Sequence, residues 1–279
     1  MRTGDGISAS LLEALRNEGL HTVEGAFAYA GGRRMTKPGL RHRARVRLEL
    51  TDAQGQAHEL YMKLYGRQPL AARIRQRIRQ WLTRRSGSSP AGIEWANIQV
   101  VRSAGIRTMR PVIAGEQPDG TEAPRSYIIV TAVPGRKLEE CMKGVLDANR
   151  DRPGVMEEFT GELAELVRKL HQAGYVHRDL YASHVFLNEA GDGRELYLID
   201  LARVFAPRWR RTRWQVKDLA QLKSSLGMEE WAGAWWPQFL RRYLASDDPR
   251  VLGRWRRMVD RKADLICLRR RKRMARAAR

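Results

Sequence analysis

Two aspartates near the middle of the chain have the setting that suits phosphoryl transfer. Asp179 lies in a predicted loop, and Asp200 ends the short apolar segment Leu196–Ile199. A second apolar segment, Val185–Leu187, precedes the turn-forming residues 188–193, so the two segments are expected to pair as a hairpin. Such a hairpin holds both carboxylates at one end. One carboxylate would accept or orient the proton of an acceptor hydroxyl, and the other would hold Mg²⁺ against the phosphates.

A histidine lies between the two aspartates in the sequence. His184 follows Asp179 by five residues, while His177 and Arg178 directly precede it. The same residues would also fit a buried ion-pair hairpin in an unrelated fold. The residue types alone therefore leave both interpretations open.

The motif H-R-D-x-Y-x-x-H at residues 177–184 resembles the catalytic loop of protein-kinase-like enzymes. The usual pattern there is H-R-D, an Asn five residues after the Asp, and then D-F-G. In this chain His184 stands at the Asn position, and residues 200–202 (Asp-Leu-Ala) stand at D-F-G. The motif is similar, more specifically, to the lipopolysaccharide-core sugar kinases, the Kdo/heptose kinase family. The resemblance covers roughly residues 37–222, and the change from Asn to His is its main departure.

The resemblance implies an α+β, bilobal, protein-kinase-like fold with a small antiparallel β lobe and a larger, mainly helical lobe. We expect a nucleotide-binding lobe at residues 1–131, with a basic helical insertion at 67–90. A catalytic lobe would follow at 132–249, and a basic helix or tail at 250–279. The length of 279 residues allows one large domain or two lobes that share a cleft, and 43% hydrophobic residues can build a core.

Alternating apolar residues predict the strands of the smaller lobe. Residues 44–50 and 59–65 both alternate apolar with polar side chains, which is typical of half-buried strands. Phe27–Ala30 is expected to form an earlier strand, and Ser10 to cap a short helix that ends at Gly19.

The nucleotide-binding residues follow from the resemblance. Lys63 would grip the α- and β-phosphates, and Glu94, on a predicted helix at 91–105, would pair with that lysine. A basic, glycine-containing turn with Lys37 would cover the nucleotide. The main chain of Thr131–Val133, with Thr131 and Val133 as its candidates, would bind the adenine edge of ATP.

The catalytic residues are also implied by the resemblance. Asp179 would act on the acceptor hydroxyl, with His177 and Arg178 in the same motif and Arg178 pairing with a nearby acid. Asp200 would bind Mg²⁺. His184 would be a second metal ligand or would orient the metal shell, although imidazole suits Mg²⁺ less well than an amide oxygen does. A further acid outside the motif, Asp218, is expected to brace the loop backbone and not to react.

The formal net charge of +21 indicates an anionic partner. An anionic glycolipid, an anionic membrane surface and nucleic acid all fit this charge, although the kinase motif disfavours nucleic acid. Two basic helices, predicted at residues 71–85 and 250–279, are typical of contact with an anionic surface but equally of solvated faces. The sequence does not indicate the oligomeric state.

Several features suggest the cytoplasm, with peripheral attachment to the inner face of the cytoplasmic membrane. The two cysteines match no disulfide framework, no apolar run reaches the length of a membrane span, and the N-terminus lacks an apolar signal core.

Three functional hypotheses stay open from the sequence. The first is an ATP- and Mg²⁺-dependent kinase of a lipopolysaccharide inner-core sugar, Kdo or heptose, or of a similar glycolipid. The second is a kinase-like enzyme acting on a protein or a soluble small molecule. The third is a non-catalytic, kinase-like binding module for anionic surfaces. The presence of Lys63, Asp179 and Asp200 favours an enzyme, while His184 in place of Asn keeps the third hypothesis open.

Overall fold

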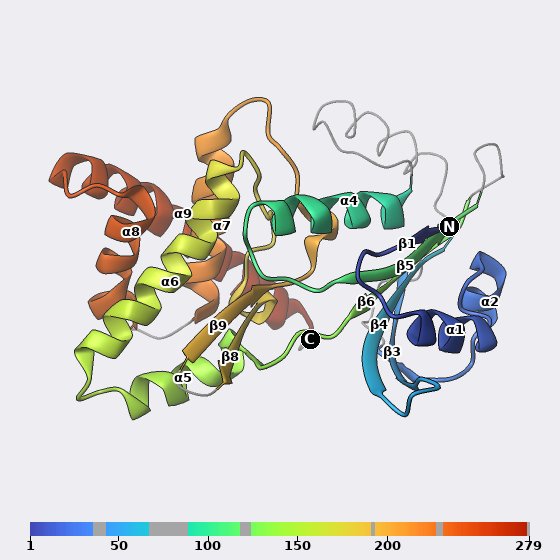
Figure 1. Ribbon diagram of the computed structural model, residues 1–279. Helices are drawn as coiled ribbons and strands as arrows, with labels where there is room; N and C mark the ends of the chain where they lie inside the picture. Colours follow the sequence, from blue (N-terminus) through green and yellow to red (C-terminus); the bar gives the residue numbers. More distant parts are fainter. Residues whose placement is uncertain (36–42, 67–88, 118–123, 191–192, 227–230, 278–279) are drawn as a thin grey trace. The chain divides into compact units, whose positions relative to one another are not determined.

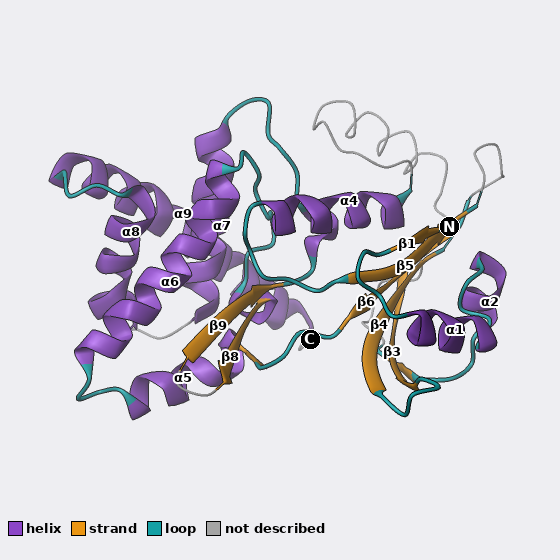
Figure 2. Ribbon diagram, in the orientation of Figure 1, coloured by secondary structure: helices purple, strands orange, loops and turns teal. Residues whose placement is uncertain are grey.

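The computed structural model describes residues 1–35, 43–66, 89–117, 124–190, 193–226 and 231–277. The chain forms two compact units (Figures 1 and 2). The first unit comprises residues 1–100 and 108–133, and the second comprises residues 101–107 and 134–279.

A six-stranded antiparallel sheet organises the first unit, with the strand order β1-β5-β6-β4-β3-β2. Its strands are β1 (Arg2–Thr3), β2 (Arg33–Arg34), β3 (Arg43–Thr51), β4 (Ala57–Tyr65), β5 (Pro111–Glu116) and β6 (Ser126–Thr131). Its helices are α1 (Ala9–Asn17), α2 (Val23–Ala28) and most of α4 (Pro90–Ser103).

The alternation along β4 sends its side chains to two different neighbours. Leu60, Met62 and Leu64 join the apolar cluster formed with α1 and α2. Because successive strand residues point to opposite faces, Lys63 and Tyr65 face the other way, and both contact α4. The period of two predicted for this strand is thus what directs Lys63 to its partner.

Two local predictions for the first unit are wrong. Residues expected as a strand at Phe27–Ala30 belong instead to α2 and its C-terminal end, and the side chain of Thr22 caps this helix by accepting from the Gly25 amide at 3.0 Å. The cap of α1 is Ser8, whose side chain accepts from the Leu11 amide, and not Ser10. Ser10 lies inside the first turn of α1, where its hydroxyl donates to Asp52 at 2.9 Å.

The described part of the second unit combines a small sheet with helices. The helices are α5 (Leu138–Ala148), α6 (Pro153–Gln172), α7 (Arg211–Leu226), α8 (Trp236–Leu244) and α9 (Pro249–Ala277). The antiparallel sheet runs β7 (Arg136–Lys137), β8 (Val185–Ala190) and β9 (Gly193–Leu198). Helices α5 and α6 contact the sheet, α6 packs on α8, and α7 packs on α9. Three single-turn elements complete the unit: η1 (Ala182–His184), η2 (Leu201–Arg203) and η3 (Trp231–Trp235).

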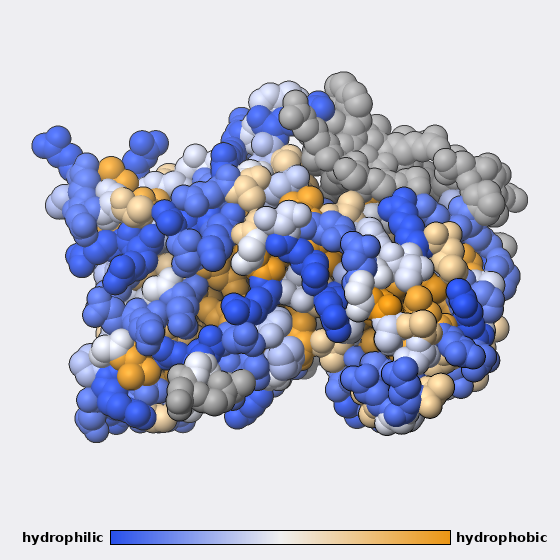
Figure 3. All heavy atoms as spheres, in the orientation of Figure 1, coloured by the Kyte–Doolittle hydropathy of each residue, from blue (hydrophilic) through white to orange (hydrophobic). Residues whose placement is uncertain are grey.

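Most of the face drawn in Figure 3 is hydrophilic, and its apolar residues gather in small patches. Over the described residues, we find no helix that combines the length and the apolar character needed to cross a bilayer.

Candidate active site

A buried ion pair joins a strand and a helix of the first unit. The Lys63 ammonium contacts the Glu94 carboxylate, and the Tyr65 hydroxyl donates to the other Glu94 oxygen at 2.5 Å. The Glu94 side chain is fully buried and that of Lys63 is 11% exposed. Removing one partner of such a pair would leave a buried charge uncompensated, so the pair fixes the lysine head group in one place.

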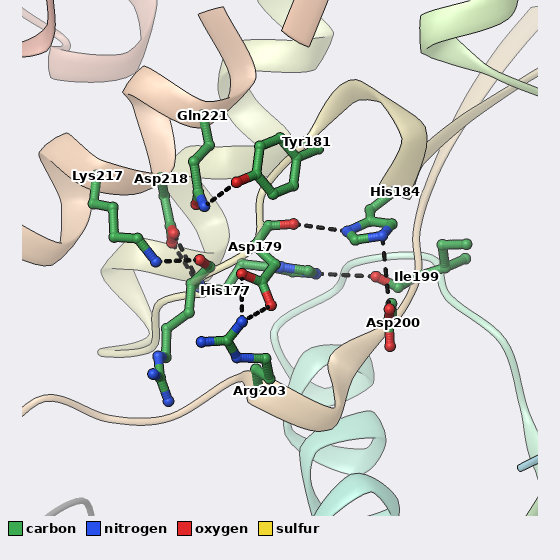
Figure 4. Close-up of polar contacts among 11 residues, drawn as sticks. His177, Asp179, Tyr181, His184, Ile199, Asp200, Arg203, Lys217, Asp218 and Gln221 are labelled. Carbon is green, nitrogen blue, oxygen red and sulfur yellow. Dashed lines mark hydrogen bonds and ion pairs between the residues drawn. The ribbon is translucent and has the colours of Figure 1, made fainter. Parts of the chain in front are cut away.

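The buried carboxylate of Asp218, on α7, holds the backbone of the loop that carries Asp179. One Asp218 oxygen accepts from the His177 amide at 2.6 Å, and the other accepts from the Arg178 amide at 2.8 Å (Figure 4). Arg178 has a φ of 72°. A left-handed residue lets successive N–H groups converge on one anion, which is the geometry of a backbone nest. The Asp218 contacts thus hold the backbone that presents Asp179.

His177 ties this loop to the start of the Asp200 segment. Its ring is fully buried, and Nε2 donates to the Ile199 carbonyl at 3.0 Å. Since a carbonyl only accepts, Nε2 must carry a hydrogen. Burial lowers the pKa of His177, so the ring stays neutral near pH 7. This position has no exposed surface for a substrate.

His184 connects the two aspartates directly. Its Nδ1 atom donates to the Asp179 carbonyl at 2.7 Å, and Nε2 lies 3.6 Å from a carboxylate oxygen of Asp200. The Ile199 amide also donates to the His184 carbonyl at 2.9 Å. Figure 4 shows the imidazole between the Asp179 backbone and the Asp200 side chain. The residue that departs from the kinase pattern thus still contacts both candidate aspartates.

Two cations near Asp179 were missed by the sequence prediction. Arg203 Nη1 donates to both Asp179 oxygens, at 2.6 and 2.9 Å. Lys217 Nζ donates to the Arg178 carbonyl at 2.5 Å. Burial lowers the pKa of Lys217, while the nearby charges of Asp179 and Asp218 oppose that shift. Their positions in the sequence, three residues after Asp200 and one before Asp218, were the available signals.

Aromatic rings hold the side chain of Arg178. Its guanidinium carbon lies 5.4 Å from the Phe205 ring centroid and 5.6 Å from that of Trp214. The two rings meet edge to face at 5.2 Å. These contacts are cation–π interactions, and they anchor the loop to the segment that follows Asp200. The acid that the sequence analysis expects as a partner of this arginine stays a prediction.

The tyrosine of H-R-D-x-Y contributes a further link to α7. The Tyr181 hydroxyl accepts from Gln221 at 2.9 Å, and the Ala182 amide donates to the Ser225 hydroxyl at 2.7 Å. Helix α7 therefore supports the whole loop between Asp179 and His184.

Asp200 is the residue that the sequence analysis expects to hold Mg²⁺. Within the described ranges, no group of three or more His, Cys, Asp or Glu side chains is placed to hold a metal ion. Mg²⁺ is usually bound through one or two carboxylates together with phosphates and waters. Asp200 supplies such a carboxylate. The Nδ1 atom of His184 carries the ring hydrogen that it donates to Asp179. In a neutral ring, the lone pair of Nε2 therefore points toward Asp200.

The other nucleotide-binding candidates are the main chain of Thr131–Val133 and Lys37. The Thr131 amide donates to the Arg110 carbonyl at 2.9 Å, and the Ala132 amide donates to the Glu59 carbonyl at 2.9 Å, so both are used within the first unit. Val133 is the last residue of that unit. Lys37 and the basic helix predicted at residues 71–85 lie outside the described residues.

Comparisons with known proteins show which family the chain resembles in sequence and in fold. A family model described as "Lipopolysaccharide kinase (Kdo/WaaP) family" matches residues 40–243. The lipopolysaccharide core heptose(I) kinase WaaP of Pseudomonas aeruginosa is 29% identical over 133 residues, which are 46% of this chain and 50% of the relative. The protein of the same name from Escherichia coli K12 is 30% identical over 155 residues, 53% of this chain and 58% of the relative.

A solved structure described as "WaaP in complex with acyl carrier protein" matches with a TM-score of 0.59 and 25% identity. The match covers 87% of this chain and 91% of the other. It confirms the predicted α+β, protein-kinase-like fold class. In sequence, however, the matched region spans about half the length of the curated relatives.

Proposed function

The chain belongs to the lipopolysaccharide kinase (Kdo/WaaP) family, and from this premise we propose that it transfers the γ-phosphoryl group of ATP to a sugar hydroxyl. The acceptor is a Kdo or heptose residue of the lipopolysaccharide inner core, or a similar glycolipid. The observation that carries the proposal is His184, which bonds to the backbone of Asp179 and faces the carboxylate of Asp200. This contact holds two carboxylates with different roles in one rigid arrangement.

Asp179 acts on the acceptor. Its carboxylate accepts a hydrogen bond from the sugar hydroxyl and receives the proton as the oxygen attacks the γ-phosphorus. The bond between that phosphorus and the β,γ-bridging oxygen breaks, and ADP leaves. Arg203 and the backbone contacts to Asp218 keep the carboxylate in position. His177 and Arg178 act through this loop as positioning residues, because one is buried and the other is packed on aromatic rings.

Asp200 holds the cation of the nucleotide, and His184 orients that carboxylate or shares the cation. Bound Mg²⁺ supplies charge neutralisation for the phosphates. Lys63, fixed by Glu94, binds phosphate oxygens in the first unit, and Val133 offers its main chain to the adenine. Lys37 stays a candidate of the same kind.

The experiment is phosphate transfer from γ-labelled ATP with purified full-length protein and lipid-linked inner-core acceptor. Label is expected in the glycolipid, and Asp179→Ala and Asp200→Ala each abolish it. Label that appears only in protein or in a soluble metabolite would support the second hypothesis instead. If wild type neither binds Mg·ATP nor transfers label to any acceptor, the protein is a binding module and the proposal fails.

We also propose that the protein works peripherally on the inner face of the cytoplasmic membrane. The support is α9, in which Leu268 and the residues from 269 to 276 are all exposed and include six cations, Arg269, Arg270, Arg271, Lys272, Arg273 and Arg276. Each cation near an anionic bilayer contributes about 1 kcal/mol at most. Flotation with phosphatidylglycerol vesicles, but not with phosphatidylcholine vesicles, is expected, and equal behaviour with both would contradict it.

Association with acyl carrier protein is a further candidate, because the solved WaaP structure was described in complex with that protein. Co-elution of the two purified proteins as one species on size exclusion would support the association, and separate elution would oppose it.

A further inference from the structure

The segment that follows Asp200 is strongly cationic. Residues 201–217 contain six cations and no acid, namely Arg203, Arg208, Arg210, Arg211, Arg213 and Lys217. Residues 208–213, which we term the arginine turn, are exposed throughout, and they include Trp209, whose exposed fraction is 67%. A large exposed aromatic side chain among arginines is the composition of a recognition surface.

This arrangement is electrostatically unfavourable in the protein alone. Residues 211–213 of the arginine turn form the start of α7, a helix of 16 residues with no acid in its first turn. Cations at a helix N-terminus oppose the helix dipole, and like charges on neighbouring positions repel one another. An anion bound here would relieve both effects. The turn therefore favours an anionic ligand more strongly than its charge alone would.

The base of the arginine turn is fixed to the catalytic loop. Phe205 pairs with Val176 through two backbone hydrogen bonds, of 3.0 and 3.1 Å. Trp214 packs on Phe205, and both rings lie against the Arg178 guanidinium. Arg211 donates to the His171 carbonyl. These contacts all lie within the second unit. Because Asp179 directly follows Arg178 in the chain, the arginine turn has a defined position relative to Asp179.

We propose that Trp209, Arg210 and Arg213 form the docking surface for the anionic glycan of the acceptor. The inference rests on the proposed function and names the part of the protein that selects its substrate. Guanidinium groups bind phosphate or carboxylate groups through paired donors, and the indole offers a flat apolar face to a sugar ring. The acceptor class is thus a sugar that carries acidic groups close to the hydroxyl that is phosphorylated.

The test compares the full-length protein with the double variant Arg210→Gln/Arg213→Gln and with Trp209→Ala. The matched control is Arg150→Gln/Arg152→Gln, which removes two exposed arginines from the segment between α5 and α6 in the same unit. Transfer from γ-labelled ATP to lipid-linked inner-core acceptor is measured at varied concentrations of each substrate. The double variant is expected to raise the acceptor KM by about tenfold or more, with the KM for ATP unchanged. The control stays within about twofold.

A second readout is independent of turnover. Fluorescence anisotropy reports binding of a labelled, deacylated inner-core oligosaccharide without ATP, and both arginine-turn variants are expected to weaken it. Equal KM and equal binding in wild type and variants would overturn the docking surface, as would equal losses in the matched control. Loss of vesicle binding with unchanged oligosaccharide binding would also overturn it, because the turn would then contact the bilayer.

The two proposals fail in different ways. Glycan binding that depends on the arginine turn, in a protein that transfers no phosphate, would contradict the kinase function and leave the docking surface standing. Normal transfer by both arginine-turn variants would contradict the docking surface and leave the kinase function standing. Since the substituted side chains are exposed, thermal melting curves close to that of wild type are expected and exclude misfolding as the cause.

Discussion

The Nε2 atom of His184 lies 3.6 Å from a carboxylate oxygen of Asp200. The opposite ring nitrogen donates to the Asp179 carbonyl, so a neutral imidazole turns its lone pair toward another acceptor. The lone pairs of two acceptors repel one another unless a proton or a metal ion lies between them. His184, which stands at the Asn position of the kinase pattern, thus keeps a side chain beside the carboxylate of Asp200.

His184→Ala is expected to raise the Mg²⁺ concentration for half-maximal phosphate transfer by about tenfold or more, since partners of metal ligands typically contribute that much. His184→Asn restores an oxygen donor and is expected to recover part of the loss. The measurement is a Mg²⁺ titration at saturating ATP. His21→Ala, a histidine of the other unit, serves as the control. An unchanged Mg²⁺ requirement in His184→Ala would remove the histidine from the cation site.

Arg203 positions Asp179 through a single nitrogen that contacts both carboxylate oxygens. Arg203→Ala frees this carboxylate to rotate, and misplacing a catalytic group by about 1 Å can cost about 100-fold in rate. We therefore expect kcat to fall by roughly that factor with little change in the KM for ATP. Arg203→Lys retains a cation and should recover part of the rate.

The matched control for Arg203 is Arg107→Ala. Arg107 pairs with Glu195 in the same unit and its side chain is 60% exposed. It should change kcat by less than about twofold, as exposed ion pairs contribute little. If both substitutions lower kcat equally, the effect of Arg203 is structural.

The sequence predicted the elements and residues whose signals are local. The alternation at residues 59–65 predicted β4, and the two apolar segments on either side of the turn at residues 188–193 predicted the hairpin of β8 and β9. The role of Lys63, in contrast, was inferred from the family resemblance. Arg203 and Lys217 were missed because their contacts with the catalytic loop depend on tertiary packing between segments that are up to 39 residues apart. Phe27–Ala30 was misassigned because a short apolar run does not distinguish strand from helix, and the Thr22 cap decided the outcome.

Glu94→Gln tests the buried pair with Lys63. The amide keeps the shape but removes the carboxylate charge that faces the buried lysine, so the free energy of unfolding is expected to fall by about 3–5 kcal/mol, and transfer activity to fall with it. Chemical denaturation of wild type and variant measures the first effect. Glu140→Gln, which breaks an exposed pair with Lys137, should cost less than about 1 kcal/mol. Equal stability of the two variants would show that Lys63 has another anchor.

Asp52 links α1 to the turn between β3 and β4. It also makes the stability of the first unit depend on pH in the acidic range. Its fully buried carboxylate accepts from His58, Ser10 and the amides of Gln54 and Gln56, at 2.9–3.0 Å. The hydrogen bond from His58 is the largest cause that lowers the pKa of Asp52 from 3.8 to about 2. Burial of the carboxylate opposes this shift, and the bonds from Ser10, Gln56 and Gln54 add to it.

The sign of the pH effect follows from proton binding. Between about pH 4 and about pH 2 the unfolded chain binds a proton at Asp52 and the folded protein does not, so the contribution of this carboxylate to stability is complete above pH 4 and is lost as pH falls toward 2. Urea midpoints measured across this range should decline less steeply in Asp52→Asn than in wild type, because the amide has no proton to gain. Asp5→Asn, at an exposed position, should retain the wild-type slope. A slope that is the same in all three proteins would mean that the acid sensitivity of this unit comes from other carboxylates.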